Sequence, residues 1–425
     1  MRQNNNFLFQ VLSAFILLLG NSCKNKTNED FINYHLASFP IIVEDTIPPT
    51  IEKIQNEYIV SFTDKKITDF VNNLSANDSI NLFDSTRGKA SKIEGDYLAI
   101  LNKKFDYLNL STNKLLLADK DMFVANIHSD IVDRLVNDLS IKNVETDYRI
   151  TIHSNFASII SLPSEETPWG IRRVSTLIKQ NSTYVKKVWI VDSGIDPNHE
   201  DLNVDAKLST SFYPGTKFSD VDGLGNDHGT QVAGIIGAKR NGKGIIGIAP
   251  NARLVAIKYI HNNNFNYSYY LAALKYVLVH AQAGDICNLS VENTPGSKEE
   301  ESVLSAIAAK NVIVIISAGN YQRDVDKQDQ NVFPAKFNGK NIYTVSAFSE
   351  GDTYSKFSNY GESIDISAPG QKILTTLPNN RYGINEGTSF SAPYVSGIAY
   401  LIGHLNFDGF VKQDPDIKID PIIHE

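Results

Sequence analysis

Three short segments of the chain carry side chains that together could perform nucleophilic catalysis. They are residues 191–194 (VDSG), 227–230 (DHGT) and 387–393 (GTSFSAP). A hydroxyl attacks a carbonyl only when a neighbouring imidazole takes its proton, and a carboxylate must hold that imidazole in the correct tautomer. Asp192, His228 and Ser389 supply the acid, the imidazole and the hydroxyl. We therefore predict that these three residues form a catalytic triad.

Each of these residues also has an ordinary structural explanation when it is taken alone. An Asp after a strand is usually a turn former, and a lone exposed His usually decorates a surface. Ser389 could cap a helix N-terminus, a role that Ser391 could fill equally well. Gly387 favours the catalytic interpretation, because it lets backbone and substrate approach closely. A helix that begins here would also offer N–H groups and a positive dipole end to an oxyanion.

Asn320 is the candidate for a further group that stabilises negative charge. It ends the segment 317–320 (SAGN), directly after the most apolar strand-like run of the chain. Asn after Gly is ordinarily a turn signal. Beside a nucleophile, its side-chain amide could instead donate to the tetrahedral intermediate together with the backbone N–H of Ser389.

A set of apolar, β-branched runs predicts the strands that position these side chains. The runs are residues 188–191, 253–257, 286–289, 312–316 and 342–345, with helical stretches such as 269–281 and 302–310 between them. Continuous apolar strands that alternate with helices are typical of a parallel sheet covered on both faces. The predicted fold is therefore α/β, with a mostly parallel central sheet. Ligands bind beyond the carboxyl ends of such strands, where Asp192 and Asn320 lie.

The start of the chain is typical of an exported protein. Arg2 and the apolar run 7–20 predict a signal peptide over residues 1–22, and the run is too short for a confident membrane span. Residues 19–24 (LGNSCK) resemble a bacterial lipoprotein signal, in which Cys23 would carry the lipid. A plain secretory peptide is the alternative. The other cysteine, Cys287, has no partner for a structural disulfide and lies in an apolar run that favours a buried thiol.

A small α+β domain is predicted between the start and the α/β region. Residues 23–56 are a linker interrupted by Pro48-Pro49, and residues 57–150 form the domain. Its expected elements are strands at 58–62, 122–127 and 144–148 and helices at 67–74 and 131–139, with a polar, helix-prone stretch over 86–120. Residues 151–167 are an exposed linker suited to proteolytic cutting, and residues 168–425 form the catalytic domain.

Composition limits the classes of function. The chain has 425 residues, of which 42% are hydrophobic and 21% charged, as in ordinary folded proteins. This length suffices for two or three domains. The formal net charge of −8 and the lack of a long Lys/Arg block argue against a nucleic-acid or anionic-membrane partner.

Four motifs taken together resemble the subtilase family of serine peptidases. They are VDSGI from 191, HGTQVAG from 228, SAGN from 317 and GTSFSAP from 387, and the resemblance covers roughly residues 168–405. The chain order Asp, His, Ser is also that of subtilisin. Residues 57–150 resemble the family's inhibitor-type propeptide through YIVSF, FVAN, VDRL and VETDY, with an unrelated module as the alternative. The resemblance implies an extracytoplasmic, monomeric endopeptidase that acts on polypeptides and is made as a precursor inhibited by its own propeptide.

The resemblance implies further site residues. Ser290, Val291 and Glu292 match the edge segment on which a peptide adds as a β-strand, with Ala318 and Gly319 also binding substrate. The family often has glycines after Ser290, so Val291-Glu292-Asn293 predicts a narrower or differently charged cleft.

Three other features follow from the resemblance. Asp201 and Asn241 match a calcium site, with a plain turn as the alternative, and no cofactor is required for the chemistry. Phe333-Pro334 resembles a loop whose proline can be cis. Only 36 residues follow Ser389, ending in a polar, proline-broken segment, so we expect a C-terminally minimal catalytic domain.

Two other functions compete with the peptidase. A catalytically silent binding or scaffold protein of the cell envelope would keep the fold without the reaction. An esterase would need its nucleophile in a G-x-S-x-G context, and residues 387–391 (GTSFS) lack the final glycine.

Overall fold

The structure is a computed structural model, and it describes part of the chain. The described residues are 48–63, 92–110, 115–119, 121–152, 158–175, 186–221, 227–292, 294–327, 332–416 and 419–425. The chain divides into two units, Met1–Asp45 and Thr46–Glu425, and only the second contains described residues. The predicted signal peptide, Cys23, most of the linker and the predicted helix at 67–74 therefore lie outside the described residues. No described helix has the length and apolar character needed to cross a bilayer.

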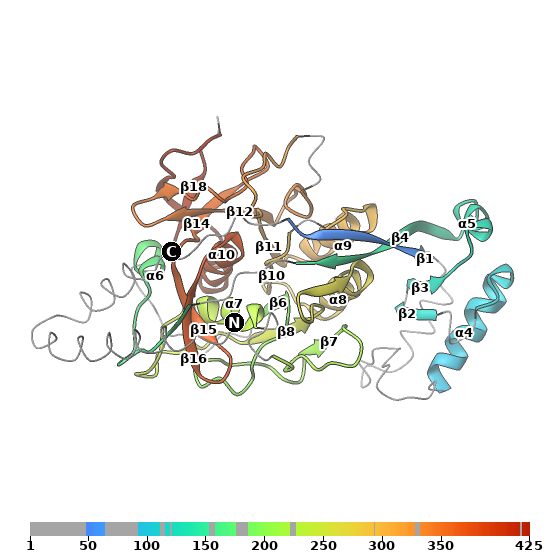
Figure 1. The fold of residues 1–425 in the computed structure, drawn as a ribbon, viewed down its shortest axis with the longest axis horizontal. Coiled ribbons are helices and arrows are strands. Elements are labelled where there is room, and N and C mark those ends of the chain that lie inside the picture. Colours follow the sequence, from blue (N-terminus) through green and yellow to red (C-terminus); the bar gives the residue numbers. More distant parts are fainter. Residues whose placement is uncertain are drawn as a thin grey trace, which may run out of the picture. The chain divides into compact units, whose positions relative to one another are not determined.

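Ten strands of the described residues form the central sheet (Figure 1). Their order is β17 (Asn406–Phe410), β18 (Pro421–His424), β14 (Ile366–Pro369), β12 (Ile342–Ser349), β11 (Ile313–Ser317), β10 (Ile286–Leu289), β6 (Val188–Asp192), β8 (Leu254–Lys258) and β7 (Thr210–Ser211), while β13 (Thr353–Tyr354) pairs with β12. The pairs from β18 to β7 are parallel, and β17 and β13 pair antiparallel with their neighbours. The five predicted strands are therefore confirmed: four have bounds within one residue of the prediction, and β12 extends four residues further.

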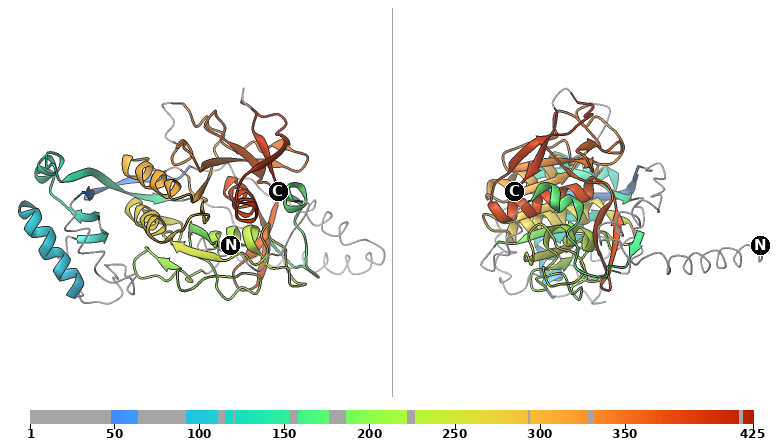
Figure 2. Two further views of the ribbon diagram at one scale, coloured as in Figure 1. Left: turned by 180° about the vertical axis from the view of Figure 1, so that it is seen from behind. Right: turned by 90° about the vertical axis from the view of Figure 1, so that its left-hand side faces the viewer.

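Helices cover both faces of this sheet. Val188 and Ile190 of β6 pack in one core with α7 (His228–Gly237) and α10 (Thr388–Ile402). Trp189 and Val191, on the opposite face, pack in a second core with α8 (Tyr267–His280) and α9 (Lys298–Ala309). Figure 2 shows α8 and α9 side by side, away from α10. Successive side chains of a strand point to opposite faces, so an all-apolar strand such as β6 needs cover on both.

A second, antiparallel sheet is built mainly from the predicted small domain. Its order is β2 (Leu115–Asp119), β3 (Met122–Asn126), β1 (Thr50–Phe62), β4 (Ile141–Thr151) and β9 (Asn264–Asn266). The helices beside it are α4 (Lys92–Lys104), the 3-10 turn η2 (Asp106–Leu108) and α5 (Ser129–Val136). Phe62, Phe105, Phe123 and Leu135 are among its buried core residues. Because β9 belongs to the α/β region, this sheet joins the two predicted domains.

Two boundaries in the small domain differ from the prediction. Strand β1 begins at Thr50 rather than near residue 57, so part of the expected linker is strand that starts directly after Pro49. Helix α5 ends at Val136, and Leu139, expected on its apolar face, is 101% exposed. Asp138 accepts hydrogen bonds from the backbone and hydroxyl of Ser140, which favours a turn over another helical turn.

Two more segments adopt strands where the sequence indicated loops. Strand β5 (Ser158–Ile160) lies within the expected processing linker and pairs with β16 (Arg381–Asn385), which pairs in turn with β15 (Ile373–Leu377). The C-terminal segment forms β18, whose Ile422 and Ile423 are fully buried. Its proline, Pro421, stands at the first position of the strand, where a missing N–H is tolerated. The catalytic domain is therefore not left without a final strand at its core.

Candidate active site

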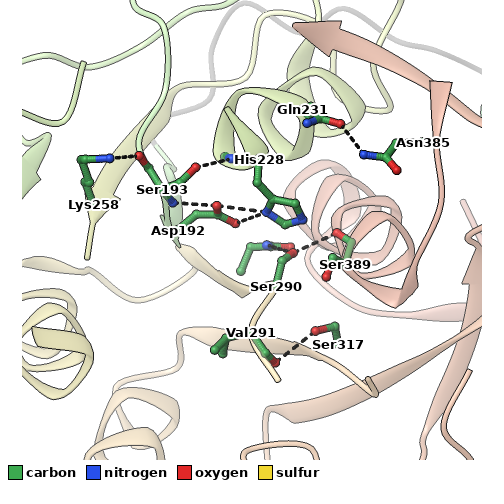
Figure 3. Close-up of polar contacts among 12 residues, drawn as sticks. Asp192, Ser193, His228, Gln231, Lys258, Ser290, Val291, Ser317, Asn385 and Ser389 are labelled. Carbon is green, nitrogen blue, oxygen red and sulfur yellow. Dashed lines mark hydrogen bonds and ion pairs between the residues drawn. The ribbon is translucent and has the colours of Figure 1, made fainter. Parts of the chain in front are cut away.

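Asp192 and His228 are in direct polar contact at the predicted site (Figure 3). Asp192 is the last residue of β6 and is 1% exposed, and His228 is the first residue of α7. The His228 Nδ1 atom lies 3.0 Å from Asp192 Oδ1 and 2.9 Å from Oδ2. This contact places the Nδ1 proton on the carboxylate side of the ring, which leaves Nε2 as the proton acceptor.

The charges around His228 favour its protonated form. Burial opposes a charge on the ring, but Asp192, then Asp227 and Glu292, outweigh it and raise the pKa of His228 above its usual value. The imidazole is therefore a stronger base than an isolated histidine, which suits a residue that takes a proton from a hydroxyl.

The backbone around Asp192 is held by buried contacts. Gly229 N donates to Ser193 Oγ at 3.0 Å, and the buried Lys258 ammonium donates to the carbonyl oxygen of Ser193 (Figure 3). A Cβ on Gly229 would lie 2.3 Å from the carbonyl oxygen of Gly194, so only glycine permits this approach. The start of α7 is thereby packed directly on the segment that carries Asp192. Sequence reasoning did not identify Lys258 as part of this support.

Ser389 lies in the first turn of α10, beside the histidine. Gly387 is the N-cap of this helix, with φ of 141°, a backbone conformation that favours glycine. Ser290 Oγ donates to the carbonyl oxygen of Ser389 at 2.9 Å, which ties the helix start to the segment after β10. The next residue, Phe390, has its ring centroid 5.3 Å from that of His228. Within the described residues, no hydrogen bond joins Ser389 Oγ to the His228 ring (Figure 3). Such contacts are often longer before substrate binds.

Asn320 is fixed by the residue that precedes Ser389. Its Oδ1 accepts from Thr388 N at 2.7 Å and from Thr388 Oγ1 at 3.1 Å. The carbonyl end of the amide is thus bound to the start of α10, and Nδ2 is left to donate elsewhere. It donates to Glu292 Oε2 at 3.2 Å.

Comparison with known proteins agrees with the motifs. The model of the subtilase family matches residues 186–412, which is more than half of the chain. The chain belongs to the subtilase family. Its relatives include Subtilisin NAT of Bacillus subtilis subsp. natto, 30% identical over 347 residues, which are 80% of this chain and 81% of that protein. Alkaline elastase YaB of Bacillus sp. (strain YaB) is 29% identical over 373 residues, which are 86% of each.

A solved structure shares the fold of this subtilase. The crystal structure of a cold adapted subtilisin-like serine proteinase matches with a TM-score of 0.50 and 23% identity, over 60% of this chain and 97% of that chain. The predicted α/β class with a mostly parallel sheet is therefore confirmed. Together with the relatives, the family match identifies the protein as a subtilisin-like serine endopeptidase.

The predicted substrate-binding residues of the subtilase lie together. Ser290 accepts from Asn288 Nδ2, and the Val291 carbonyl accepts from Ser317 Oγ at 3.2 Å, which joins the segment after β10 to the end of β11 (Figure 3). Ala318 is fully buried, and a Cβ on Gly319 would lie 3.2 Å from Glu292 Oε2. Tyr321 also belongs here, because its OH donates to Glu292 Oε1 at 2.8 Å. Its position directly after Asn320 was the signal that sequence reasoning did not use.

The residues predicted for calcium contact each other in the subtilase. Asn241 Nδ2 donates to Asp201 Oδ1 at 2.8 Å, while Tyr382 OH donates to Asp201 Oδ2 at 2.8 Å. Both carboxylate oxygens are therefore engaged with donors, and calcium needs six to eight converging oxygens. As arranged, Asp201 and Asn241 do not present oxygens that converge on an ion. The predicted calcium site therefore gains no support from these contacts and stays a prediction. The Phe333–Pro334 bond is cis, as the resemblance suggested.

Proposed function

We propose that Asp192, His228 and Ser389 are the catalytic triad with which this endopeptidase hydrolyses peptide bonds. The main support is the contact of His228 Nδ1 with both oxygens of the buried Asp192 carboxylate. Further support comes from the start of α10, where Ser389 is held by Ser290 and lies next to the ring that packs on His228.

The proposed reaction has two halves. Ser389 Oγ attacks the scissile carbonyl carbon while His228 Nε2 takes the hydroxyl proton. The tetrahedral intermediate then breaks its C–N bond as His228 returns that proton to the leaving amine, which leaves an acyl-enzyme ester. A water attacks the ester, again with His228 as base, and the carboxylic acid leaves as Ser389 regains its proton. Asp192 stays ionised and stabilises the imidazolium throughout.

Asn320 Nδ2 and the Ser389 backbone N–H are the proposed donors to the oxyanion. The support is that Thr388 holds the Asn320 carbonyl end in place, so the amide is already oriented before the reaction begins. A pre-oriented donor is worth more than a mobile one, and losing one such donor typically lowers turnover about a hundred- to a thousandfold.

The 57–150 domain is proposed to be an intramolecular inhibitor. Strand β4 pairs with β9 of the catalytic part, and Asp147 Oδ1 accepts from Ser268 N near the start of α8. The buried Lys275 ammonium lies 2.7 Å from Asp121 of the small domain and 2.7 Å from Glu299 of α9. These contacts would hold the domain on the enzyme until the connection is cut. Export, lipid attachment at Cys23 and a monomeric state remain predictions.

A serine-directed fluorophosphonate probe tests the proposal. We expect the whole chain to be labelled and to cut itself between about 148 and 168, and expect Ser389→Ala to do neither. Ser391→Ala is the matched control, because Ser391 lies in the same helix turn and is buried. N-terminal sequencing of the products would locate the cut. A folded, mature wild type without labelling or hydrolysis would instead indicate a silent binding or scaffold protein.

A further inference from the structure

The Glu292 carboxylate lies against the proposed oxyanion donor. Oε2 accepts from Asn320 Nδ2 at 3.2 Å, and Oε1 accepts from Tyr321 OH at 2.8 Å. The same carboxylate lies over Gly319, where a Cβ would come within 3.2 Å of Oε2. Three consecutive residues after β11 therefore surround an acidic group that the segment after β10 supplies.

Within the described residues, no Lys or Arg forms an ion pair with the Glu292 carboxylate. Burial raises its pKa, against the hydrogen bonds from Tyr321 and Asn320 and the charge of His228. A carboxylate in such a setting is costly to ionise unless a cation joins it. A positive charge from a bound substrate would therefore stabilise the ionised Glu292 carboxylate beyond what His228 does.

The proposed reaction places a substrate side chain at this carboxylate. The scissile carbonyl must lie between Ser389 Oγ and Asn320 Nδ2, and the carboxylate is already in contact with that amide. In the substrate residue that supplies this carbonyl, the first side-chain atom, Cβ, is only two bonds from the carbonyl carbon. That side chain therefore starts beside Glu292, on the wall formed by Gly319 and the segment after β10.

We propose that Glu292 makes this enzyme selective for substrates with a lysine or arginine directly before the bond that is cut. The inference rests on the proposed function, because the triad defines where the substrate carbonyl lies. The Glu292 carboxylate pairs with the substrate cation in the bound complex. Charge-assisted pairs of this kind are among the stronger polar contacts that a site can offer.

The same pairing affects the oxyanion donor. While its carboxylate accepts from Asn320 Nδ2, Glu292 competes with the oxyanion for that donor and repels its charge. A substrate cation draws the Glu292 carboxylate toward itself and offsets the negative charge of the carboxylate. A basic substrate therefore gains in kcat as well as in KM, whereas a neutral substrate meets a partly blocked donor.

Paired peptides test the inference. The enzyme obtained by expressing the whole chain is given fluorogenic peptides that differ only in Arg, Leu or Glu before the cut. We expect wild type to prefer Arg over Leu about tenfold or more in kcat/KM. In Glu292→Gln the amide keeps the shape without the charge, and the preference for Arg disappears while kcat for the Leu peptide rises.

A matched control and a reference variant separate the possible outcomes. Glu386→Gln also removes a partly buried carboxylate, two residues before the N-terminal residue of α10, and should keep the Arg preference. An equal rate for Arg and Leu in wild type and Glu292→Gln, with normal fluorophosphonate labelling, overturns the inference and leaves the proposed function intact. A uniform rise on all peptides in Glu292→Gln also overturns it, because Glu292 would then only block the donor. Hydrolysis that persists in Ser389→Ala contradicts the proposed function itself.

Discussion

The charges around His228 decide the pH range in which the proposed base can work. The ring must be neutral to accept the Ser389 proton, and its pKa is raised by Asp192, Asp227 and Glu292 against the effect of burial. Each of these carboxylates lies on a different short segment, so no single motif contains the whole electrostatic environment. Activity at acidic pH is therefore a property of several residues that the fold brings to one ring.

We expect kcat/KM for a neutral peptide to fall as the pH drops below the pKa of His228, by about tenfold per pH unit, because protonation removes the base. The inflection should lie above the ordinary histidine value of 6.5. In Glu292→Gln one of the negative charges is lost, so the inflection should move to lower pH. A pH profile of kcat/KM from pH 5 to 9 measures both. Identical inflections in the two proteins would contradict this electrostatic account.

At the scale of elements, hydrogen bonds fix helix α10 both at its start and near its middle. Ser290 binds the Ser389 carbonyl, Thr388 binds Asn320, and Ser396 Oγ donates to Asn288 Oδ1 at 2.8 Å. The helix packs against α7 and against several strands of the sheet. The proposed nucleophile, Ser389, is therefore positioned by neighbours on both sides, and the strands under α10 help to fix its place.

Strand β18 is expected to contribute to stability although it lies close to the chain end. Ile422 is fully buried, at 0% solvent exposure, and its backbone pairs with that of Ser367 of β14. Ile422→Ala should lower the free energy of unfolding by about 2–4 kcal/mol, because the truncation removes buried methyl groups and leaves a cavity. Ile419→Ala is the control, since Ile419 is 48% exposed and should change it by less than about 0.5 kcal/mol.

Urea unfolding in the Ser389→Ala background, which avoids self-digestion, measures both changes. Equal effects of the two substitutions would show that β18 does not pack on the core in solution.

At the scale of the whole molecule, two buried carboxyl groups lie where the small domain meets the catalytic part. Glu57 of β1 lies near Asp147 of β4, and burial together with the interaction between the two carboxyl groups raises the pKa of Glu57 to about 7. The charge of Arg149 and the hydrogen bond from Asn266 Nδ2 act to lower the pKa of Glu57. Tyr269 of α8 faces the two carboxyl groups. In the folded protein, Glu57 therefore keeps its proton up to a higher pH than it does in the unfolded chain.

This linkage predicts that the contact weakens as the pH rises. Because the pKa of Glu57 is raised in the folded state, its contribution to stability is fully present below about pH 4.5. The contribution is lost as the pH rises to about 7. For Ser389→Ala we expect a decrease on the order of 1–3 kcal/mol across this pH range. Glu57→Gln should flatten the dependence, and Glu52→Gln, an exposed residue on the same strand, should not. Thermal unfolding at several pH values measures this, and parallel curves for all three proteins would refute it.

Much of the candidate site could be predicted from local sequence. Asp192, His228, Ser389 and Asn320 were identified because each stands in a short motif at the end of a strand or the start of a helix. The strands of the central sheet followed from continuous apolar runs, since burial on both faces leaves a composition that is visible without any partner. The prediction was wrong at Leu139, where a turn ends the helix earlier than expected. It also missed β5, a short strand at the edge of its sheet.

The amino-acid sequence by itself determined which residue types are candidates for the reaction, and it determined the α/β class, because both depend on residues that are neighbours along the chain. Only the tertiary structure decided that Glu292 meets Asn320 and Tyr321, that β9 extends the sheet of the small domain, and that β18 completes the central sheet. These contacts join segments far apart in the chain. They depend on the path of the backbone between them, which no local pattern of residues encodes.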